Sequence, residues 1–300
     1  MGTNSLDIDN TKRRAYSTCP RKFFYEHVKN LRPRFGSTAL RFGQTWHSVM
    51  EAYYGVIRDK GWSFKSEAIT KGVMAGKATW DKETQGRQFY EDYRTLENCL
   101  SAFMGHITNY SDDEQFLEVI DVEKTFRIEI APDIFFVGKV DGKVKLNGAI
   151  WLLEHKTTGM PIDKQLKTLL RDPQVIGYTF AGMQEQSVEG ILIPMLHVSA
   201  SKSRTTGAYG KARIEYRRSP QIFTQGDIDS WKSSLLWTAG MIKSSLENNF
   251  WPMQMDSCYH FGACSFTALC EQNAPVNETN TENYIVVEHW NVLTEGKDKV

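Results

Sequence analysis

The 300-residue sequence lacks any apolar run near the roughly 18 residues that a membrane-spanning helix needs. Its N-terminal segment, MGTNSLDIDNTKRR, also lacks the apolar core of a secretory signal peptide. Both absences predict a soluble cytoplasmic protein without a membrane partner, in a bacterium or in the host cell if a phage encodes it. Apolar residues make up 41% of the chain, which excludes global disorder and allows one or two domains with a sizeable core.

The sequence also lacks an excess of charge of either sign, because 36 basic residues balance 36 acidic ones. This balance argues against a protein held to nucleic acid by bulk positive charge alone. The charges are nevertheless unevenly distributed, with a net of +6 over residues 1–50, +5 over 199–220 and −4 over the last thirty residues. A local basic groove for a phosphate backbone is therefore compatible with neutrality, although each block also fits an ordinary solvated face.

Cysteine is scarce, and its count of five is odd. Three of the five are grouped near the C-terminus, and in a reducing compartment such grouping favours metal ligation over disulfides. Cys99 has no motif around it and is predicted to be a free thiol in the core. The chain shows no internal repeat and no helicase motif.

The apolar pattern predicts helices first and strands afterwards. Residues 20–118 are mainly helical in pattern, and apolar residues recur every three or four positions between 39 and 58. Strand-like runs follow at 119–130, 134–146 and 149–157, and the last two are joined by Asn147-Gly148, a strong hairpin signal.

The remaining chain alternates between the two kinds of element. The pattern predicts a helix over 163–186, a buried strand over 190–199 and an amphipathic helix over 225–247. Pro194 indicates a bulge or an edge position for that strand. YIVVEHW at 284–290 indicates a late strand or an interaction tail.

The segment VGKVDGKVKLNGAIWLLEHK, residues 137–156, carries the most informative chemistry. A hairpin at the Asn-Gly pair can bring Asp141 beside Glu154, and Lys156 shares the face of Glu154 because strand side chains alternate, whereas His155 points oppositely. Two converging carboxylates suit Mg²⁺ or Mn²⁺, and a lysine beside them can stabilise charge on a phosphate. A charged hairpin alone would more often be a surface salt bridge, but the apolar Trp151, Leu152 and Leu153 indicate a central strand.

The runs VGKVDG, LLEHKTTG and QVIGY resemble the three motifs of the PD-(D/E)xK nuclease superfamily, most closely its RecB-like branch. That branch includes AddB nuclease domains and CRISPR-associated iron–sulfur exonucleases. The resemblance implies that Asp141 and Glu154 bind Mg²⁺ or Mn²⁺ together with the backbone carbonyl of His155, and that Lys156 assists the attacking water. LRFGQTWHSVMEAYY resembles the Arg-x-Gly and helical His element of the branch, which implies a metal-ligating His47. DNA-positioning roles are implied for Arg41, Gln174 and Tyr178.

The resemblance also gives the cysteines a role. TCPRKFFYEHV resembles an N-terminal Cys-Pro element of the iron–sulfur members, which implies that Cys19 joins Cys258, Cys264 and Cys270 around a [4Fe-4S] cluster. The chain has Cys-x5-Cys-x5-Cys where the branch usually has Cys-x2-Cys-x5-Cys, and His260 lies in the first gap. A Zn²⁺ site therefore stays an alternative.

Together these features predict an α/β protein with a restriction-endonuclease-like core, a central mixed sheet flanked by helices. The expected parts are an N-terminal helical region (1–118), a nuclease core (119–224), a helix and cluster segment (225–272) and an acidic tail (273–300). The predicted function is a metal-dependent DNA nuclease, by resemblance an exonuclease on single strands or duplex ends, in recombination, repair or replication and recruited by proteins of those processes. The alternative is an inactive, cluster-containing DNA-binding or assembly module. Glu123 could approach the metal site or face solvent, and stays outside the predicted core set.

Overall fold

The computed structural model describes residues 5–185, 187–260, 262–272, 281–288 and 292–293. The chain forms two compact units. The first unit contains residues 1–35, 125–139 and 226–300, and the second contains residues 36–124 and 140–225. None of the helices in the described residues is long and apolar enough to cross a membrane.

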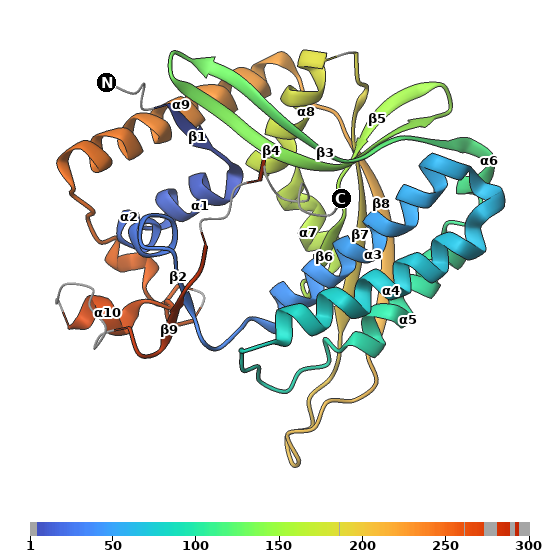
Figure 1. Ribbon diagram of the computed structural model, residues 1–300, viewed down its shortest axis with the longest axis horizontal. Coiled ribbons are helices and arrows are strands. Elements are labelled where there is room, and N and C mark those ends of the chain that lie inside the picture. Colours follow the sequence, from blue (N-terminus) through green and yellow to red (C-terminus); the bar gives the residue numbers. More distant parts are fainter. Residues whose placement is uncertain (1–4, 186, 261, 273–280, 289–291, 294–300) are drawn as a thin grey trace. The chain divides into compact units, whose positions relative to one another are not determined.

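Three long helices of the second unit pack side by side (Figure 1). They are α3 (Thr38–Lys60), α4 (Lys65–Thr84) and α5 (Leu96–Asn109), and short helices follow α3 (η2, Trp62–Phe64) and α5 (α6, Asp113–Phe116). The Ser37 side chain accepts a hydrogen bond from the Leu40 amide and so caps the start of α3. Gly61, whose φ of 83° suits glycine, ends that helix. The apolar periodicity at 39–58 therefore correctly predicts α3.

The predicted Asn-Gly turn joins two antiparallel strands into a hairpin. After β3 (Leu117–Ala131), β4 (Ile134–Leu146) pairs antiparallel with β5 (Ala149–Leu153). Asn147 and Gly148 have φ values of 50° and 85°, the left-handed pair that a type I′ turn requires. Gly142 lies opposite Leu153 in this register, which brings Asp141 level with Glu154, as the sequence predicts.

The strand predicted at 149–157 is interrupted. β5 ends at Leu153, and β6 (Lys156–Thr158) resumes the pairing with the parallel strand β7 (Gly190–Ser199) in the same register. That register places Pro194 opposite His155. Proline has no N–H to give to a ladder, so the interruption coincides with the one residue of β7 that cannot donate.

β7 is a central strand, so an edge position for it is the wrong expectation. It pairs with β5 and β6 in parallel and with β8 (Arg213–Gln221) antiparallel. All its residues except Ser199 are buried. Pro194 is accommodated inside the sheet because the facing residue His155 directs its amide to Asp141 Oδ2, whereas the Glu154 amide still donates to the Leu192 carbonyl of β7 at 3.1 Å.

The helix predicted over 163–186 is two helices. α7 (Ile162–Leu169) ends before Asp172, and α8 (Pro173–Glu185) begins at a proline. Proline suits the first turn of a helix because its missing N–H would have no partner there, and it disfavours helical geometry at the residue before it. The break therefore has a local cause that periodicity alone does not reveal.

Helices cover both faces of the sheet in the second unit. Leu153 and Leu192 join the core formed with α3 and α5, whereas the neighbouring Leu152 packs against Gly182 of α8. This alternation is expected of strands buried on both faces. A mixed sheet flanked by helices confirms the predicted α/β fold class.

The first unit gathers short elements from both ends of the chain. Leu6–Ile8 pairs in parallel with the start of β4, and Leu31–Pro33 pairs antiparallel with Tyr284–Val286, which confirms part of the late strand predicted at 284–290. Residues 289–291 lie outside the described residues, as do most of the predicted acidic tail 273–300. The domain boundaries inferred from sequence stay a prediction.

The elements of the first unit are short apart from α9. They are β1 (Leu6–Ile8), α1 (Asn10–Thr18), α2 (Pro20–Phe23), η1 (Phe24–Val28), β2 (Leu31–Pro33), α9 (Gln225–Asn248), η3 (Met255–Ser257), α10 (Thr267–Glu271) and β9 (Tyr284–Val286).

Candidate functional site

The site is built around an ion pair between a helix and a strand of the second unit. His47 of α3 and Asp141 of β4 are 94 residues apart in sequence, and Nδ1 of the histidine lies 3.0 Å from Oδ1 of the carboxylate. The His47 side chain is 35% exposed and that of Asp141 is 10% exposed. The pair therefore lies at a surface that substrate can reach, with the carboxylate the more enclosed of the two.

Glu123 joins this pair through an unusual backbone conformation. It lies within β3, yet its φ is 54°, in the left-handed region that a glutamate rarely adopts. Ligand atoms of Glu123, His47 and Asp141 all lie within 4.8 Å of one another. Sequence reasoning left Glu123 outside the core set because strand periodicity carries no signal for such a local reversal.

Glu154 lies in the interruption between β5 and β6, and Lys156 is the first residue of β6. Oε1 of Glu154 accepts hydrogen bonds from Lys156 Nζ at 3.0 Å and from Gln174 Nε2 at 2.9 Å. Oε2 of the same carboxylate is buried and has no hydrogen-bond donor among the described residues. A buried carboxylate oxygen without a donor is rare in proteins and is well suited to a bound cation.

His155 contributes through its backbone and through its buried ring. Its amide N–H donates to Asp141 Oδ2 at 2.6 Å. The amide can make this bond because His155 lies where the pairing of β5 and β6 with β7 is interrupted. The ring stacks on Tyr54, with centroids 5.8 Å apart and an angle of 20°. Burial lowers the pKa of His155 to about 3, so the ring is neutral and acts as packing beneath the site.

α8 supplies two polar side chains at the same place. Lys156 Nζ donates to Gln174 Oε1 at 2.5 Å, and Gln174 Nε2 donates to Tyr178 Oη at 3.2 Å. Gln174 and Tyr178 are four residues apart and therefore share a helix face. Gln174 uses its carbonyl for the lysine and its amide for Glu154, which sets the position of both groups.

Opposing charges set the protonation of the site. Burial disfavours the charged form of His47, but Asp141 outweighs that effect and raises its pKa. Burial also opposes the Asp141 charge, yet His47 brings the Asp141 pKa below its usual range. Burial and then the Asp141 carboxylate raise the pKa of Glu154. The Glu154 carboxylate in turn overcomes burial and raises the pKa of Lys156.

The donor set fits a hard divalent cation. Asp141 and Glu123 offer carboxylate oxygens and His47 an imidazole nitrogen within 4.8 Å of one another, a combination that Mg²⁺ or Mn²⁺ accepts. Glu154 lies outside this close group and adds a buried oxygen that has no donor among the described residues. Like-charged carboxylates that converge in a partly buried place repel one another, and a cation would relieve that repulsion. The arrangement can therefore hold a metal beside a protonated lysine, as hydrolysis of a phosphodiester requires.

A family model described as the PD-(D/E)XK nuclease superfamily matches residues 11–271, which include every one of these side chains. The chain belongs to the PD-(D/E)XK nuclease superfamily. The sequence-based recognition at this level is confirmed, and nuclease chemistry on nucleic acid is the activity that the family carries.

Solved structures include distant neighbours of this nuclease. A crystal structure from Eubacterium rectale, provisionally named as an exonuclease, is 11% identical with a TM-score of 0.42, covering 92% of this chain and 90% of that one. The crystal structure of SSO0001 is 12% identical with a TM-score of 0.29, covering 65% of this chain and 74% of that one. A comparison with curated proteins gives no match.

Four thiols of the nuclease gather in the first unit. Cys19 Sγ accepts a hydrogen bond from the Gln254 amide at 3.4 Å, and the Cys264 amide donates to the Cys258 carbonyl at 2.7 Å. Burial raises the pKa of Cys270, and electrostatic interactions with the nearby Arg21, Cys19 and Cys264 also affect it. The fifth cysteine, Cys99, is buried in the core of the second unit, which agrees with its prediction as a core thiol.

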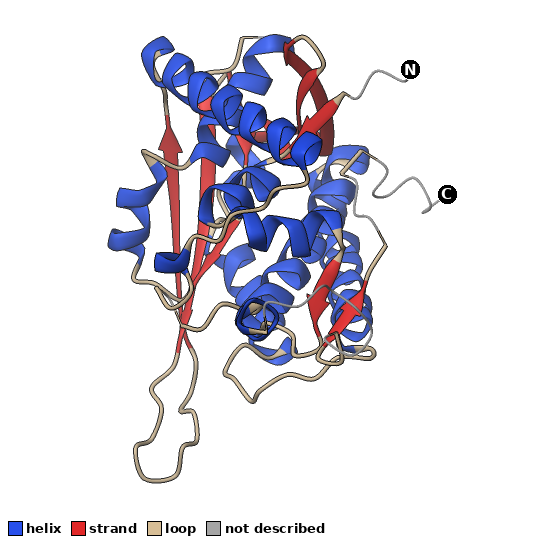
Figure 2. Cartoon of the chain, turned by 90° about the vertical axis from the view of Figure 1, so that its left-hand side faces the viewer, coloured by secondary structure: helices blue, strands red, loops and turns tan. Residues whose placement is uncertain are grey.

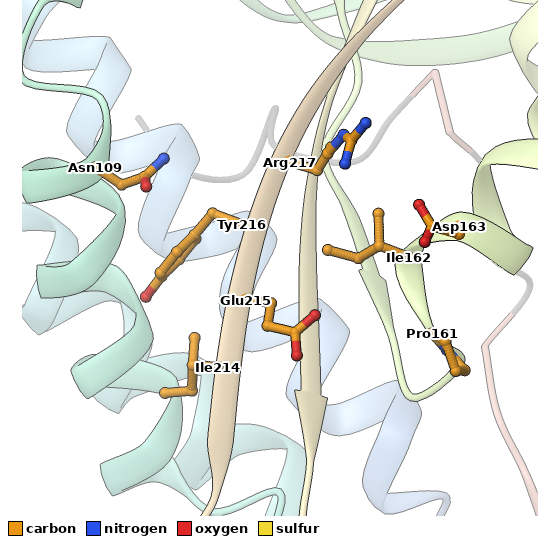
Figure 3. Close-up of a pocket in the computed structure, with 8 residues that line it drawn as sticks. All are labelled: Asn109, Pro161, Ile162, Asp163, Ile214, Glu215, Tyr216 and Arg217. Atoms are coloured by element: carbon orange, nitrogen blue, oxygen red, sulfur yellow. The ribbon is translucent and has the colours of Figure 1, made fainter.

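Arg41, predicted to position DNA, lies on α3 before His47. Its guanidinium is held between the rings of Trp80 and Phe89, at 3.9 and 3.8 Å from their centroids, and donates to Thr84 Oγ1 at 3.1 Å. A separate pocket of about 500 Å³ lies beside β8 (Figure 3), with Asp163, Glu215 and Arg217 in its lining. None of the predicted site residues lines that pocket.

Proposed function

We propose that the protein is a metal-dependent deoxyribonuclease, and specifically an exonuclease that acts on single strands or duplex ends. The observation that carries the proposal is Glu154, whose Oε1 is held by Lys156 and Gln174 while the buried Oε2 has no donor among the described residues. Such a carboxylate, level with Asp141 on the neighbouring strand, is what a phosphodiester-hydrolysing metal site needs. Recombination, repair and replication are the processes in which it would act, with proteins of those processes as recruiting partners.

The metal ligands in this proposal are Asp141, Glu154, His47 and the backbone carbonyl of His155, and the structure adds Glu123 as a further candidate. The His155 amide holds Asp141 Oδ2, so the other oxygen of that carboxylate is directed toward His47. A bound Mg²⁺ or Mn²⁺ would supply an activated water and positive charge beside the phosphate.

Lys156 acts as a charged donor in this site. Because its pKa is raised, the ammonium stays protonated at neutral pH and cannot take a proton from water. It can donate hydrogen bonds to the attacking water and to the phosphate oxygen on which charge develops. Gln174 holds the ammonium in place, and Tyr178 holds Gln174, so these two residues support the lysine in addition to any contact with DNA.

The test uses end-labelled linear single strands, blunt duplexes and closed circular single strands, each with Mg²⁺ or Mn²⁺. The wild type should degrade the linear molecules and leave the circles intact. Lys156→Ala and Glu154→Ala should each lower the rate by about 10²–10³-fold, as loss of a charge-stabilising group does. Lys167→Ala, at an exposed lysine of α7, is the matched control and should keep the full rate.

Calorimetry with Mn²⁺ gives a readout that is independent of turnover. Glu154→Ala should bind Mn²⁺ more weakly than the wild type and Lys167→Ala equally well. Equal degradation by the wild type and both site variants would refute the catalytic assignment and favour the inactive DNA-binding module. Cleavage of the circles would refute only the exonuclease preference.

We also propose that Cys19, Cys258, Cys264 and Cys270 ligate a [4Fe-4S] cluster in the first unit. Cys258 and Cys270 each interact electrostatically with both Cys19 and Cys264, and this proximity of the four thiols supports a shared metal site.

Purification without oxygen, followed by assays of iron, sulfide and zinc, tests the cluster. The expected result is a coloured protein with about four irons and four sulfides per chain. A colourless protein with stoichiometric zinc would reject the cluster and keep the cysteine site.

A further inference from the structure

A hollow of about 700 Å³ lies in the second unit and has no role in the proposed hydrolysis. Three segments contribute to its lining: the start of α3, the loop after α4 and the loop that joins β7 to β8. Figure 2 shows that last loop extending well beyond the end of the sheet. The lining includes Arg41, Arg87, Tyr90, Arg94, Lys202 and Tyr209, and these residues are called the arginine–tyrosine hollow below.

Positive charge dominates the arginine–tyrosine hollow. Four cations line it against two carboxylates, and one of these, Asp92, is engaged by Arg94 at 2.6 Å. Nε of Arg41 and Nε of Arg87 are both buried without an acceptor in the described part of the chain. Burial and the neighbouring Arg87 lower the pKa of Arg41, so this crowded pair of cations would be stabilised by an anion.

The hollow also offers aromatic surface beside the cations. Tyr90 is 73% exposed and Tyr209 is 36% exposed. Tyr209 is held by an edge-on contact with Tyr93, with centroids 5.5 Å apart, and by Lys202 at 5.1 Å from its ring. Exposed rings that alternate with cations are the arrangement that binds unpaired nucleotides, because every base has a face that can stack.

The hollow is close to the catalytic residues through two connections. Arg41 precedes His47 by six residues on α3, which is about 9 Å along the helix axis. A side-chain Cβ on Gly159 would lie 2.6 Å from Nη2 of Arg94, and Gly159 follows Lys156 by three residues. A nucleotide in the hollow would therefore be a near neighbour of the phosphate at the catalytic site.

We propose that the arginine–tyrosine hollow binds single-stranded DNA, holding the nucleotides next to the cleaved phosphate. Its arginines and Lys202 take the phosphates, and Tyr90 and Tyr209 stack on the bases. The choice of a single strand follows from the rings, since a duplex hides the faces of its bases. The inference rests on the proposed function for the choice of DNA as the nucleic acid. It adds that the site prefers a single strand to a duplex.

The experiment measures fluorescence anisotropy of a labelled 15-nucleotide oligo-dT with EDTA present, so that hydrolysis plays no part. Tyr90→Ala combined with Tyr209→Ala should raise the dissociation constant at least about tenfold, since each stacked base is worth about 1–3 kcal/mol. Tyr209→Phe should keep wild-type affinity because it keeps the ring. Affinity for a blunt 15-base-pair duplex should change less than about twofold.

Phe64→Ala is the matched control. Phe64 is 45% exposed and has Lys60 at 5.5 Å from its ring, a similar cation–aromatic pair at the opposite end of α3. Its loss should leave oligo-dT binding unchanged. Arg87→Ala should lower the dependence of log affinity on log salt by about 0.7, the value for one phosphate contact on a single strand.

Two results would overturn the inference: wild-type oligo-dT affinity in the double tyrosine variant, or an equal loss of single-strand and duplex affinity. Because EDTA removes catalysis from the measurement, its outcome is separate from that of the nuclease assay. An inactive protein whose tyrosine variants still lose oligo-dT would refute the hydrolysis and support the hollow. An active nuclease whose tyrosine variants keep wild-type oligo-dT affinity would support the hydrolysis and refute the role of the hollow.

Discussion

At the scale of single residues, Glu123 shows how a strained backbone can serve a site. Its φ of 54° places a carboxylate near His47 and Asp141, although a non-glycine residue in this conformation costs about 1–2 kcal/mol. Asp141 lies close enough for the two negative charges to repel. Strain and repulsion of this kind persist at sites where a ligand compensates for them.

Glu123→Gln should therefore separate metal binding from stability. Removing one carboxylate relieves repulsion, so the metal-free protein should gain up to about 1 kcal/mol of unfolding free energy. The rise in Tm caused by Mn²⁺ should become smaller. Thermal unfolding with and without Mn²⁺ measures both effects, with Glu118→Gln on the exposed side of the same strand as the control. A Mn²⁺ shift as large as that of the wild type would show that Glu123 is not a ligand.

At the scale of elements, the close packing of α3 against α4 depends on small residues. A Cβ on Gly76 of α4 would lie 2.6 Å from Cγ2 of Val49, and one on Gly72 would lie 3.1 Å from the Val49 carbonyl oxygen. These glycines let the helix that carries His47 approach its neighbour. Gly55 lies on another face of α3, where an added Cβ would meet no atom within 4 Å, so it has no such role.

Alanine at Gly76 and at Gly55 should have opposite effects. Gly76→Ala should lower the free energy of unfolding by about 1–3 kcal/mol, because overpacking outweighs the gain in helix propensity. Gly55→Ala should raise it by about 0.5–1 kcal/mol, since alanine favours helix and meets no atoms. Urea unfolding measures both, and stabilisation by Gly76→Ala would contradict the packing argument.

Asp92 connects the start of α3 to the loop after α4, and its ionisation makes the stability of the folded protein depend on pH. Oδ2 accepts from Thr38 at 2.6 Å and from Arg94 at 2.6 Å. Burial opposes the charge, but these bonds bring the pKa of Asp92 below its usual value near 4.

A lowered folded-state pKa stabilises the protein above the unfolded pKa, and the contribution is lost as pH falls through the folded pKa. Asp92→Asn should therefore lower stability at pH 7 and flatten the loss of stability below about pH 4. The exposed Glu91→Gln is the control. Thermal unfolding between pH 2 and 7 measures the slopes, and parallel curves for wild type and Asp92→Asn would contradict this account.

At the scale of the whole molecule, the first unit is assembled from three distant stretches of chain. Cys19 is separated from Cys258 by 239 residues, and both belong to that unit with Cys264 and Cys270. Cys264 and Cys270 pack against a small core formed by Tyr25, Leu31, Phe266, Leu269 and Tyr284. A small core has little stability to spare, so a metal cluster that joins its segments would stabilise it strongly.

Cys19→Ser should remove iron from the protein and weaken the first unit selectively. Loss of a link across so long a separation should cost about 2–5 kcal/mol, the range found for other cross-links. Hydrogen exchange should accelerate in β2, α10 and β9 and stay slow in α3 and β7. Cys99→Ala should keep the full iron content. Iron retained by Cys19→Ser would exclude this residue as a ligand.

The local features of this nuclease could be predicted from the order of its residues. Periodicity predicted α3 and α9, and the Asn-Gly pair predicted the β4–β5 turn, whose register places Asp141 level with Glu154. Each depends on neighbours along the chain, whose geometry is regular.

The tertiary fold determines how residues far apart in the sequence meet. It brought His47 to Asp141 across 94 residues, matched Pro194 to the gap that frees the His155 amide, and turned Glu123 toward the site. It also joined three segments into the arginine–tyrosine hollow. These arrangements depend on packing between elements, which local sequence patterns do not encode.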